Sequence, residues 1–154
     1  MMKTYYISTL LVVASMYMFQ AMAQTQSHKK MVESAFEQWR LGTGTPFDLL
    51  AEDATWTILG PTKSAKTYNL ADFRELVVVP FNKRLVTPLK PKVHNIYQAG
   101  DEVIILFEAE AKLVNGSVYR NSYAWFFTMQ NGQIINVRAV LDLNAYDEVM
   151  AIDI

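Results

Sequence analysis

The stretch 119-YRNSYAWFF-127 gathers the side chains best suited to hold a small molecule. In an extended strand, alternate residues share one face, which here comprises Tyr119, Asn121, Tyr123, Trp125 and Phe127. Apolar walls with one or two polar groups are typical of ligand sites. If this face lines a cavity, we expect Tyr123 and Trp125 to form walls and Asn121 to anchor the ligand. If it faces outward, the same residues would form a sheet-to-sheet homodimer contact, and alternation alone leaves both open.

Two further aromatic residues are candidates for the same site. Trp56 lies in the apolar run 54-ATWTIL-59 and points to the same side as Ile58, which predicts that it faces inward. Tyr68 follows a polar, turn-rich stretch and could offer a hydroxyl to a ligand. The alternative for both residues is ordinary packing in the core.

The carboxylates offer acid–base chemistry. Asp142 ends the last predicted strand, and a carboxyl at the mouth of an apolar cavity has a raised pKa and can act as a general base. Its alternative is to cap a tail helix, with Arg138 as a possible partner. Asp53 is expected to be a turn or capping residue at a strand entry, and Glu108 and Glu110 are expected at the wetter end of a strand.

Several other chemistries are excluded or disfavoured by composition. The chain has no cysteine, which removes disulfides and thiolate metal sites. The only histidines are His28, expected in a flexible start, and His94, alone in a strand, so a histidine zinc site is not expected. No glycine-rich phosphate loop or Ser-His-Asp pattern is present. We therefore predict no metal and no cofactor.

Helical signals come first along the chain. An apolar stripe at helical spacing predicts a first helix, capped by Ser27 and ended by Gly42; the stripe comprises Val32, Ala35, Phe36 and Trp39. Thr45 followed by a proline predicts a second, short helix. Asn69 should cap a third helix, whose apolar side comprises Leu70, Phe73, Leu76 and Val77 and which Pro80 should end or kink.

Strand signals follow. After the first strand, the remaining apolar runs alternate or are rich in aromatic residues, and they lie at roughly 89–99, 102–113, 118–129 and 133–143. The dipeptides Asn115-Gly116 and Asn131-Gly132 between them are typical of hairpin turns. The predicted architecture is α+β: three N-terminal helices packed on one face of a curved antiparallel sheet, leaving a cone-shaped hollow for a small ligand.

The element order and two phrases, 49-LLAEDATW-56 and 132-GQIINVRAVLD-142, resemble the NTF2-like superfamily, in particular its SnoaL-like and ketosteroid-isomerase-like groups. The resemblance covers nearly the whole chain after residue 23 and implies the cone-shaped fold. It does not imply one reaction, because this fold carries enzymes, ligand-binding proteins and structural modules.

The resemblance also shows where the isomerase pattern fails. Ketosteroid isomerases use an aspartate base, a tyrosine and a protonated aspartic acid. The base position falls at Ile58, the tyrosine near Ser34 or Ala35, and the acid at Ala124 or Trp125, so all three groups are missing. We therefore expect no chemistry of that kind. SnoaL-like cyclases use a cavity aspartate, and this resemblance is what brings Asp142 forward as an acid–base candidate.

The first 23 residues read as a secretory signal peptide. Lys3 precedes an uncharged apolar run, and 21-AMA-23 offers a cleavage point. We expect residues 24–154 to form one SnoaL-like domain in the periplasm or outside the cell. The net charge of the whole chain is −1, and no basic stripe is visible, so neither nucleic acid nor, after cleavage, a membrane is an expected partner.

Three functions stay open from the sequence. The first is binding of a small, largely apolar molecule by the residues named above. The second is a lyase, isomerase or cyclase with Asp142 as acid–base and Asn121 or Tyr68 stabilising an enolate-like oxygen. The third is an association module. A homodimer is expected.

Overall fold

The computed structural model describes residues 28–154. The predicted signal peptide, its cleavage point and the cap Ser27 lie outside the described residues. Within 28–154, none of the helices has the length and apolar character needed to cross a membrane.

The first described element is a helix over residues 28–41. It ends as predicted at Gly42, whose φ of 76° lies in the left-handed region that glycine adopts without strain. The amides of Gly42 and Thr43 donate to the carbonyls of Trp39 and Gln38 at 3.1 and 2.9 Å, which satisfies two of the last four carbonyls of the helix. His28 lies in this helix and is only 2% exposed, so the expectation that it belongs to a flexible start was wrong.

The second predicted helix is a single 3-10 turn, η1 (Pro46–Leu49), and it leads directly into β1 (Leu50–Ile58). A short strand that the sequence did not indicate, β2 (Thr67–Asn69), pairs antiparallel with β1. This strand is only three residues long, which is too short for an alternating pattern to be recognised in the sequence.

The third helix runs over α2 (Leu70–Phe73), the π-helical turn η2 (Arg74–Val78) and α3 (Val79–Lys83). Asn69 caps it as predicted, accepting the Asp72 amide at 2.8 Å. The helix continues past Pro80, and its wide π-helical turn immediately precedes that residue. This extra residue per turn changes the phase of the apolar stripe: Phe73 and Val77 are buried, whereas Leu76 is 50% exposed.

The remaining strands are close to their predicted bounds: β3 (Lys90–Ala99), β4 (Glu102–Lys112), β5 (Val118–Gln130) and β6 (Gln133–Leu141). Successive strands are antiparallel, and positive φ angles of 50° and 78° at Asn131 and Gly132 mark the predicted Asn-Gly turn between β5 and β6.

The sheet is mixed rather than wholly antiparallel. Its order is β2-β1-β6-β5-β4-β3, so β1 lies beside β6, and these two strands are parallel. A side-chain hydrogen bond from Asn136 to Thr55, 2.8 Å long, joins them. The prediction of an antiparallel sheet was therefore wrong for this pair, because β1 pairs with the last strand of the chain and no hairpin signal indicates so distant a pairing.

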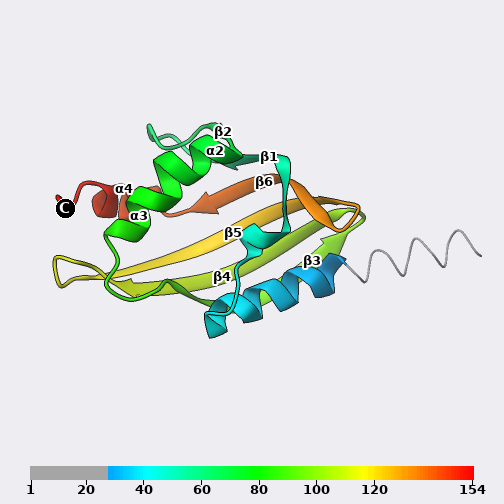
Figure 1. The fold of residues 1–154 in the computed structure, drawn as a ribbon, viewed down its shortest axis with the longest axis horizontal. Coiled ribbons are helices and arrows are strands. Elements are labelled where there is room, and N and C mark those ends of the chain that lie inside the picture. Colours follow the sequence, from blue (N-terminus) through cyan, green and yellow to red (C-terminus); the bar gives the residue numbers. More distant parts are fainter. Residues whose placement is uncertain (1–27) are drawn as a thin grey trace, which may run out of the picture.

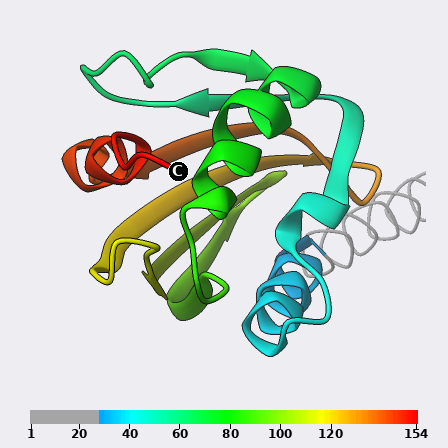
Figure 2. The same ribbon diagram turned by 60° about the vertical axis from the view of Figure 1, so that its left-hand side comes forward.

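The tail forms the helix α4 (Leu143–Met150), which buries Leu143, Tyr146 and Val149. Beyond it, the Ile152 carbonyl accepts a hydrogen bond from the Arg84 side chain at the end of α3. The chain end thus lies beside the third helix (Figure 2).

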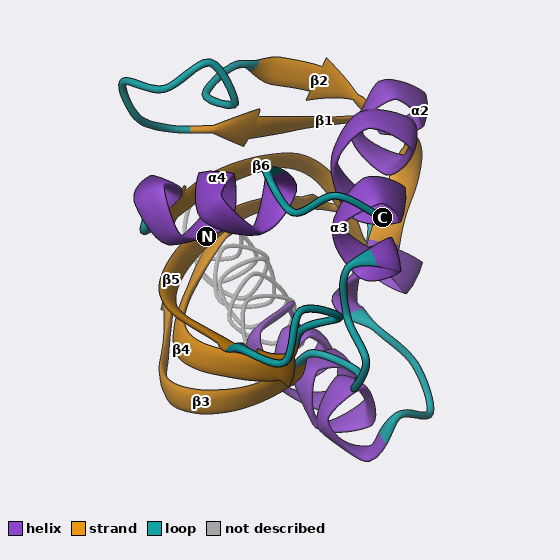
Figure 3. Ribbon diagram, turned by 90° about the vertical axis from the view of Figure 1, so that its left-hand side faces the viewer, coloured by secondary structure: helices purple, strands orange, loops and turns teal. Residues whose placement is uncertain are grey.

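The six strands curve from β2 round to β3, and the helices cover the concave side (Figures 1 and 3). Breaks in the ladder register within the β3–β4 and β5–β6 pairs accompany this curvature. The α+β class and the NTF2-like cone of the prediction are confirmed. The concave face carries the buried core and borders the cavity described below.

Candidate functional site, an aromatic cavity on the concave face

The concave side of the sheet holds a cavity of about 650 Å³ between β1, β5, β6, the third helix and the loop over residues 84–89. This volume lies within the range of small-molecule sites. The lining residues are Trp39, Gly42, Gly44, Thr45, Phe47, Trp56, Ile58, Phe73, Val77, Val78, Phe81, Asn82, Leu85, Val86, Thr87, Pro88, Leu89, Tyr119, Tyr123, Trp125, Ala139, Leu141 and Tyr146.

Stacked and edge-on aromatic rings fix the walls. Trp56 stacks on Phe73 with ring centres 4.2 Å apart and meets Trp125 edge-on at 4.9 Å. Trp39 lies nearly parallel to Trp125 at 5.9 Å. These rings come from different elements and hold one another in place, so the walls exist before any ligand arrives.

The described lining contains no carboxylate, amine, guanidinium or imidazole. Its polar side chains fall into two groups. Thr45, Asn82 and Thr87 are half-buried or exposed, whereas the phenols of Tyr119, Tyr123 and Tyr146 belong to residues at most 8% exposed; the lining list covers both groups. Besides the indole N–H donors of Trp56 and Trp125, the buried groups that can bind polar atoms in this cavity are therefore phenols.

Tyr119 and Tyr123 lie two strand positions either side of Asn121, and their hydroxyl oxygens are 2.7 Å apart. Burial raises the pKa of Tyr119 above its usual value, although its hydrogen bonds with Tyr123 and Asn121 oppose that rise. Burial raises the pKa of Tyr123 well above its usual value. Both phenols are consequently protonated at neutral pH.

Tyr146, on α4, completes the phenolic group. Its ring stacks on Phe81 at 5.7 Å, and burial raises its pKa. Among the described residues, the structure shows no hydrogen bond from its hydroxyl to Tyr119 or Tyr123.

The structure resolves the question of which way the aromatic face of β5 points. Tyr123, Trp125 and Phe127 are buried, and the first two line the cavity. Trp56 lines it too, beside Ile58. These three predicted wall residues, Trp56, Tyr123 and Trp125, therefore do come together around one hollow.

Asn121, the predicted anchor, is not in the lining of this cavity, and both hydrogens of its amide are already bonded within the protein. Its Nδ2 donates to the Tyr119 hydroxyl and to the Asp142 carbonyl, both at 2.8 Å, and its Oδ1 accepts the Asp142 amide at 2.9 Å. The sequence could not indicate this use, because the partner backbone lies 21 residues further along the chain.

Asp142 does not line the cavity either. Its carboxylate accepts the amides of Asn144 and Ala145 at 3.0 and 3.3 Å, which makes it the cap of α4. This is the alternative considered from the sequence, without the suggested partner: Arg138 pairs with Glu102 at 2.6 Å instead.

Tyr68, the last predicted ligand residue, also lies outside the lining. Its hydroxyl donates to the Ser64 carbonyl at 3.0 Å, and its ring packs against Phe73 behind the cavity wall. In this structure its hydroxyl closes the turn before β2.

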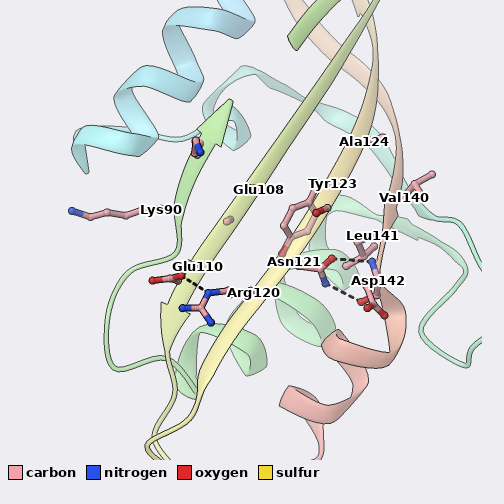
Figure 4. A pocket seen from close by; sticks show the side chains of 13 residues that line it. Lys90, Glu108, Glu110, Arg120, Asn121, Tyr123, Ala124, Val140, Leu141 and Asp142 are labelled. Atoms are coloured by element: carbon pink, nitrogen blue, oxygen red, sulfur yellow. Dashed lines mark hydrogen bonds and ion pairs between the residues drawn. The ribbon is translucent and has the colours of Figure 1, made fainter. Parts of the chain in front are cut away.

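A second hollow, of about 940 Å³, lies mainly on the outward face of the sheet, and Asn121, Tyr123 and Asp142 also border it (Figure 4). Glu108 and Glu110 are on this face, where they pair with His94 at 3.2 Å and Arg120 at 2.6 Å. Asp53 is exposed within β1. Across residues 28–154, no cluster of three or more histidine, aspartate or glutamate side chains is arranged to hold a metal ion.

The cavity also uses residues that were not predicted to belong to a ligand site. Tyr119 shares the face of Tyr123 by simple alternation, a signal that was visible but assigned no role. Tyr146 is three residues from both Leu143 and Val149, so helical spacing could have placed it inward. Phe73 and Phe81 lie on the third helix. Its π-helical turn interrupts the helical spacing from which their inward orientation could have been predicted.

Comparisons with known proteins agree with this geometry. The family model for the SnoaL-like domain matches residues 32–137. No curated protein sequence gives a significant match.

Three solved structures illustrate the likeness in fold. Bal32a, from a soil-derived mobile gene cassette, has a TM-score of 0.66 at 18% identity, over 82% of this chain and 98% of its own. A putative SnoaL-like polyketide cyclase from Jannaschia sp. CCS1 has 0.63 at 13%, over 84% and 95%. TerC, co-crystallised with polyporic acid, has 0.61 at 16%, over 80% and 98%.

Proposed function

The chain belongs to the SnoaL-like domain family, and from this premise we propose that it binds a small, uncharged, largely apolar molecule in the aromatic cavity. The proposed ligand lies between the walls formed by Trp56, Trp125 and Phe73. Export, expected from residues 1–23, would place this binding in the periplasm or outside the cell.

The observation that carries this proposal is the chemistry of the lining. A cavity of about 650 Å³ is bounded by rings and aliphatic groups, and its described lining has no charged side chain. A charged ligand would lose its hydration without gaining a counter-charge, which is costly in a medium of low polarity. An apolar ligand would gain both contact and the release of water.

The relatives give this proposal a context without fixing the ligand. TerC was co-crystallised with polyporic acid, and the protein from Jannaschia is described as a putative polyketide cyclase. Identities of 16% and 13% show a shared fold only.

The alternative of an acid–base enzyme with Asp142 has less support. A general base must reach the proton that it removes, and the Asp142 carboxylate instead faces the first amides of α4. Position 58, where the isomerases carry their base, presents the aliphatic side chain of Ile58 to the cavity.

Filling the cavity tests the proposal. Ala139 lines it and is 2% exposed, so Ala139→Leu should occupy ligand space. With 2-acetylnaphthalene as the probe, followed by quenching of tryptophan fluorescence, we expect at least a tenfold loss of affinity.

The matched control is Ala99→Leu, an identical change at an exposed strand position at the end of β3, outside the cavity lining. It should leave the affinity unchanged. Thermal unfolding of both variants would confirm that each is folded at the temperature of the titration. Equal affinities for Ala139→Leu and the unmodified protein would refute binding in this cavity.

A further inference from the structure

The hydrogen bonds around Tyr119 have a direction that the backbone imposes. The amide N–H of Asp142 points at Asn121, so the Asn121 atom that faces it must be the acceptor, Oδ1. The Asp142 carbonyl in turn requires the donor, Nδ2. The second hydrogen of that Nδ2 is then directed at the Tyr119 oxygen, 2.8 Å away.

The two phenols together carry one more hydroxyl hydrogen than they donate in hydrogen bonds within the protein. Each hydroxyl carries one hydrogen, and a single hydrogen bond joins the two oxygens, 2.7 Å apart. Tyr119 already accepts from Asn121. Among the described residues, neither hydroxyl makes a further hydrogen bond. One phenolic hydrogen of the pair is therefore free, and both tyrosines line the cavity.

Hydrogen-bond cooperativity selects which hydrogen that is. A hydroxyl that accepts a hydrogen bond becomes a better donor, so donation from Asn121 favours donation from Tyr119 to Tyr123. The series then runs from Asn121 through Tyr119 to Tyr123 and ends at the hydroxyl of Tyr123, a residue that lines the cavity.

We propose that Tyr119 and Tyr123, oriented by Asn121, act as a single hydrogen-bond donor that selects ligands carrying an acceptor oxygen, such as aromatic ketones or quinones. This inference rests on the proposed function. The hydroxyl oxygens are buried among rings, where an unpaired donor is costly, so a carbonyl oxygen at that point relieves the cost and a purely hydrocarbon ligand does not. Asn121 is a positioning residue, and Tyr123 makes the contact.

The test compares two probes of nearly the same shape. One is 2-acetylnaphthalene, and the other is 2-isopropenylnaphthalene, in which a CH₂ group replaces the carbonyl oxygen. We expect the unmodified protein to bind the ketone about fivefold more tightly than the alkene. The ratio of the two affinities cancels any general loosening of the cavity that a substitution causes.

Substitutions then test whether the two hydroxyls cause the preference for the ketone. The double variant Tyr119→Phe/Tyr123→Phe removes both hydroxyls and should reduce the ratio to about one. Tyr68→Phe, whose hydroxyl bonds to Ser64 outside the lining, is the matched control and should keep it. If the double variant does not fold, Tyr123→Phe can be used alone. It leaves the Tyr119 hydroxyl as the free donor, at a different position in the cavity, and should lower the ratio of the two affinities.

Infrared spectra of the bound ketone, edited by ¹³C labelling of its carbonyl, give an independent readout. The carbonyl band should lie at lower wavenumber in the unmodified protein than in the double variant. Equal binding of both probes, or an unchanged ratio in the double variant, would overturn the inference and leave the proposed function standing. Failure of both probes to bind would overturn the proposed function itself.

Discussion

At the scale of single residues, Tyr119 and Tyr123 are notable for keeping their protons. Burial raises both pKa values, so the folded protein retains phenolic protons at a pH where the unfolded chain, with an ordinary value of 10.0, has begun to release them. The folded state then binds more protons than the unfolded state, and stability must fall as pH rises.

A measurable consequence is a steeper loss of stability above pH 10. The contribution from the two phenols is fully present below that value and is lost progressively above it, at up to about 1.4 kcal/mol per pH unit for each phenol. Urea unfolding at several alkaline pH values should show a shallower loss in Tyr119→Phe/Tyr123→Phe. Parallel pH profiles for the two proteins would contradict the buried, protonated state of the pair.

At the scale of elements, α4 depends on its cap. Asp142 satisfies two amides of the first turn, and the helix then presents Tyr146 to the cavity. Asp142→Ala should therefore cost about 1 kcal/mol of unfolding free energy, whereas Asp142→Asn should cost little, because asparagine caps helices as well as aspartate does.

Chemical denaturation of the two variants tests this prediction, and probe binding by Asp142→Asn tests its functional side. The affinity of Asp142→Asn for 2-acetylnaphthalene should match that of the unmodified protein. A large loss of affinity with unchanged stability would instead show that the Asp142 carboxylate takes part in ligand binding.

The elements also show what local sequence can and cannot predict. The Asn131-Gly132 turn and the four long strands follow from dipeptide and alternation signals that act within a few residues. The short β2 and the exposure of Leu76 do not, since one depends on pairing with β1 and the other on an irregular helical turn.

The same division holds for the site. Trp56, Tyr123 and Trp125 were predicted as walls from alternation, and the structure places them on the cavity. Asn121 was predicted to anchor a ligand because its amide can donate and accept hydrogen bonds. In the structure, that amide is bonded to Tyr119 and to the backbone of Asp142. Sequence patterns indicate which face a side chain is on, but not whether its hydrogen bonds are already made.

At the scale of the whole molecule, the outward face of the sheet is the surface on which we expect the homodimer. Its centre is apolar, and the half-buried side chains there are Ile104, Leu106, Ala124 and Phe126. The ion pairs of Glu110 with Arg120 and of Glu102 with Arg138 flank this patch. An apolar centre with a polar rim is the usual anatomy of a protein interface.

Sedimentation velocity would check this expectation. Phe126→Glu should turn the dimer into a monomer, because the new carboxylate would be buried without a partner. Leu41→Glu, at a 58% exposed site at the end of the first described helix, is the control and should leave the mass unchanged. A monomeric unmodified protein would rule the dimer out.

The parallel pairing of β1 with β6 has a consequence for the order of folding. The hairpins from β3 to β6 can form from contacts close in the chain, whereas Thr55 must find Asn136, 81 residues away. Closing so long a loop is entropically slow. During synthesis, Trp56 therefore emerges long before the strand that encloses it, and the nascent chain must keep this apolar stretch from aggregating until its last hairpin arrives.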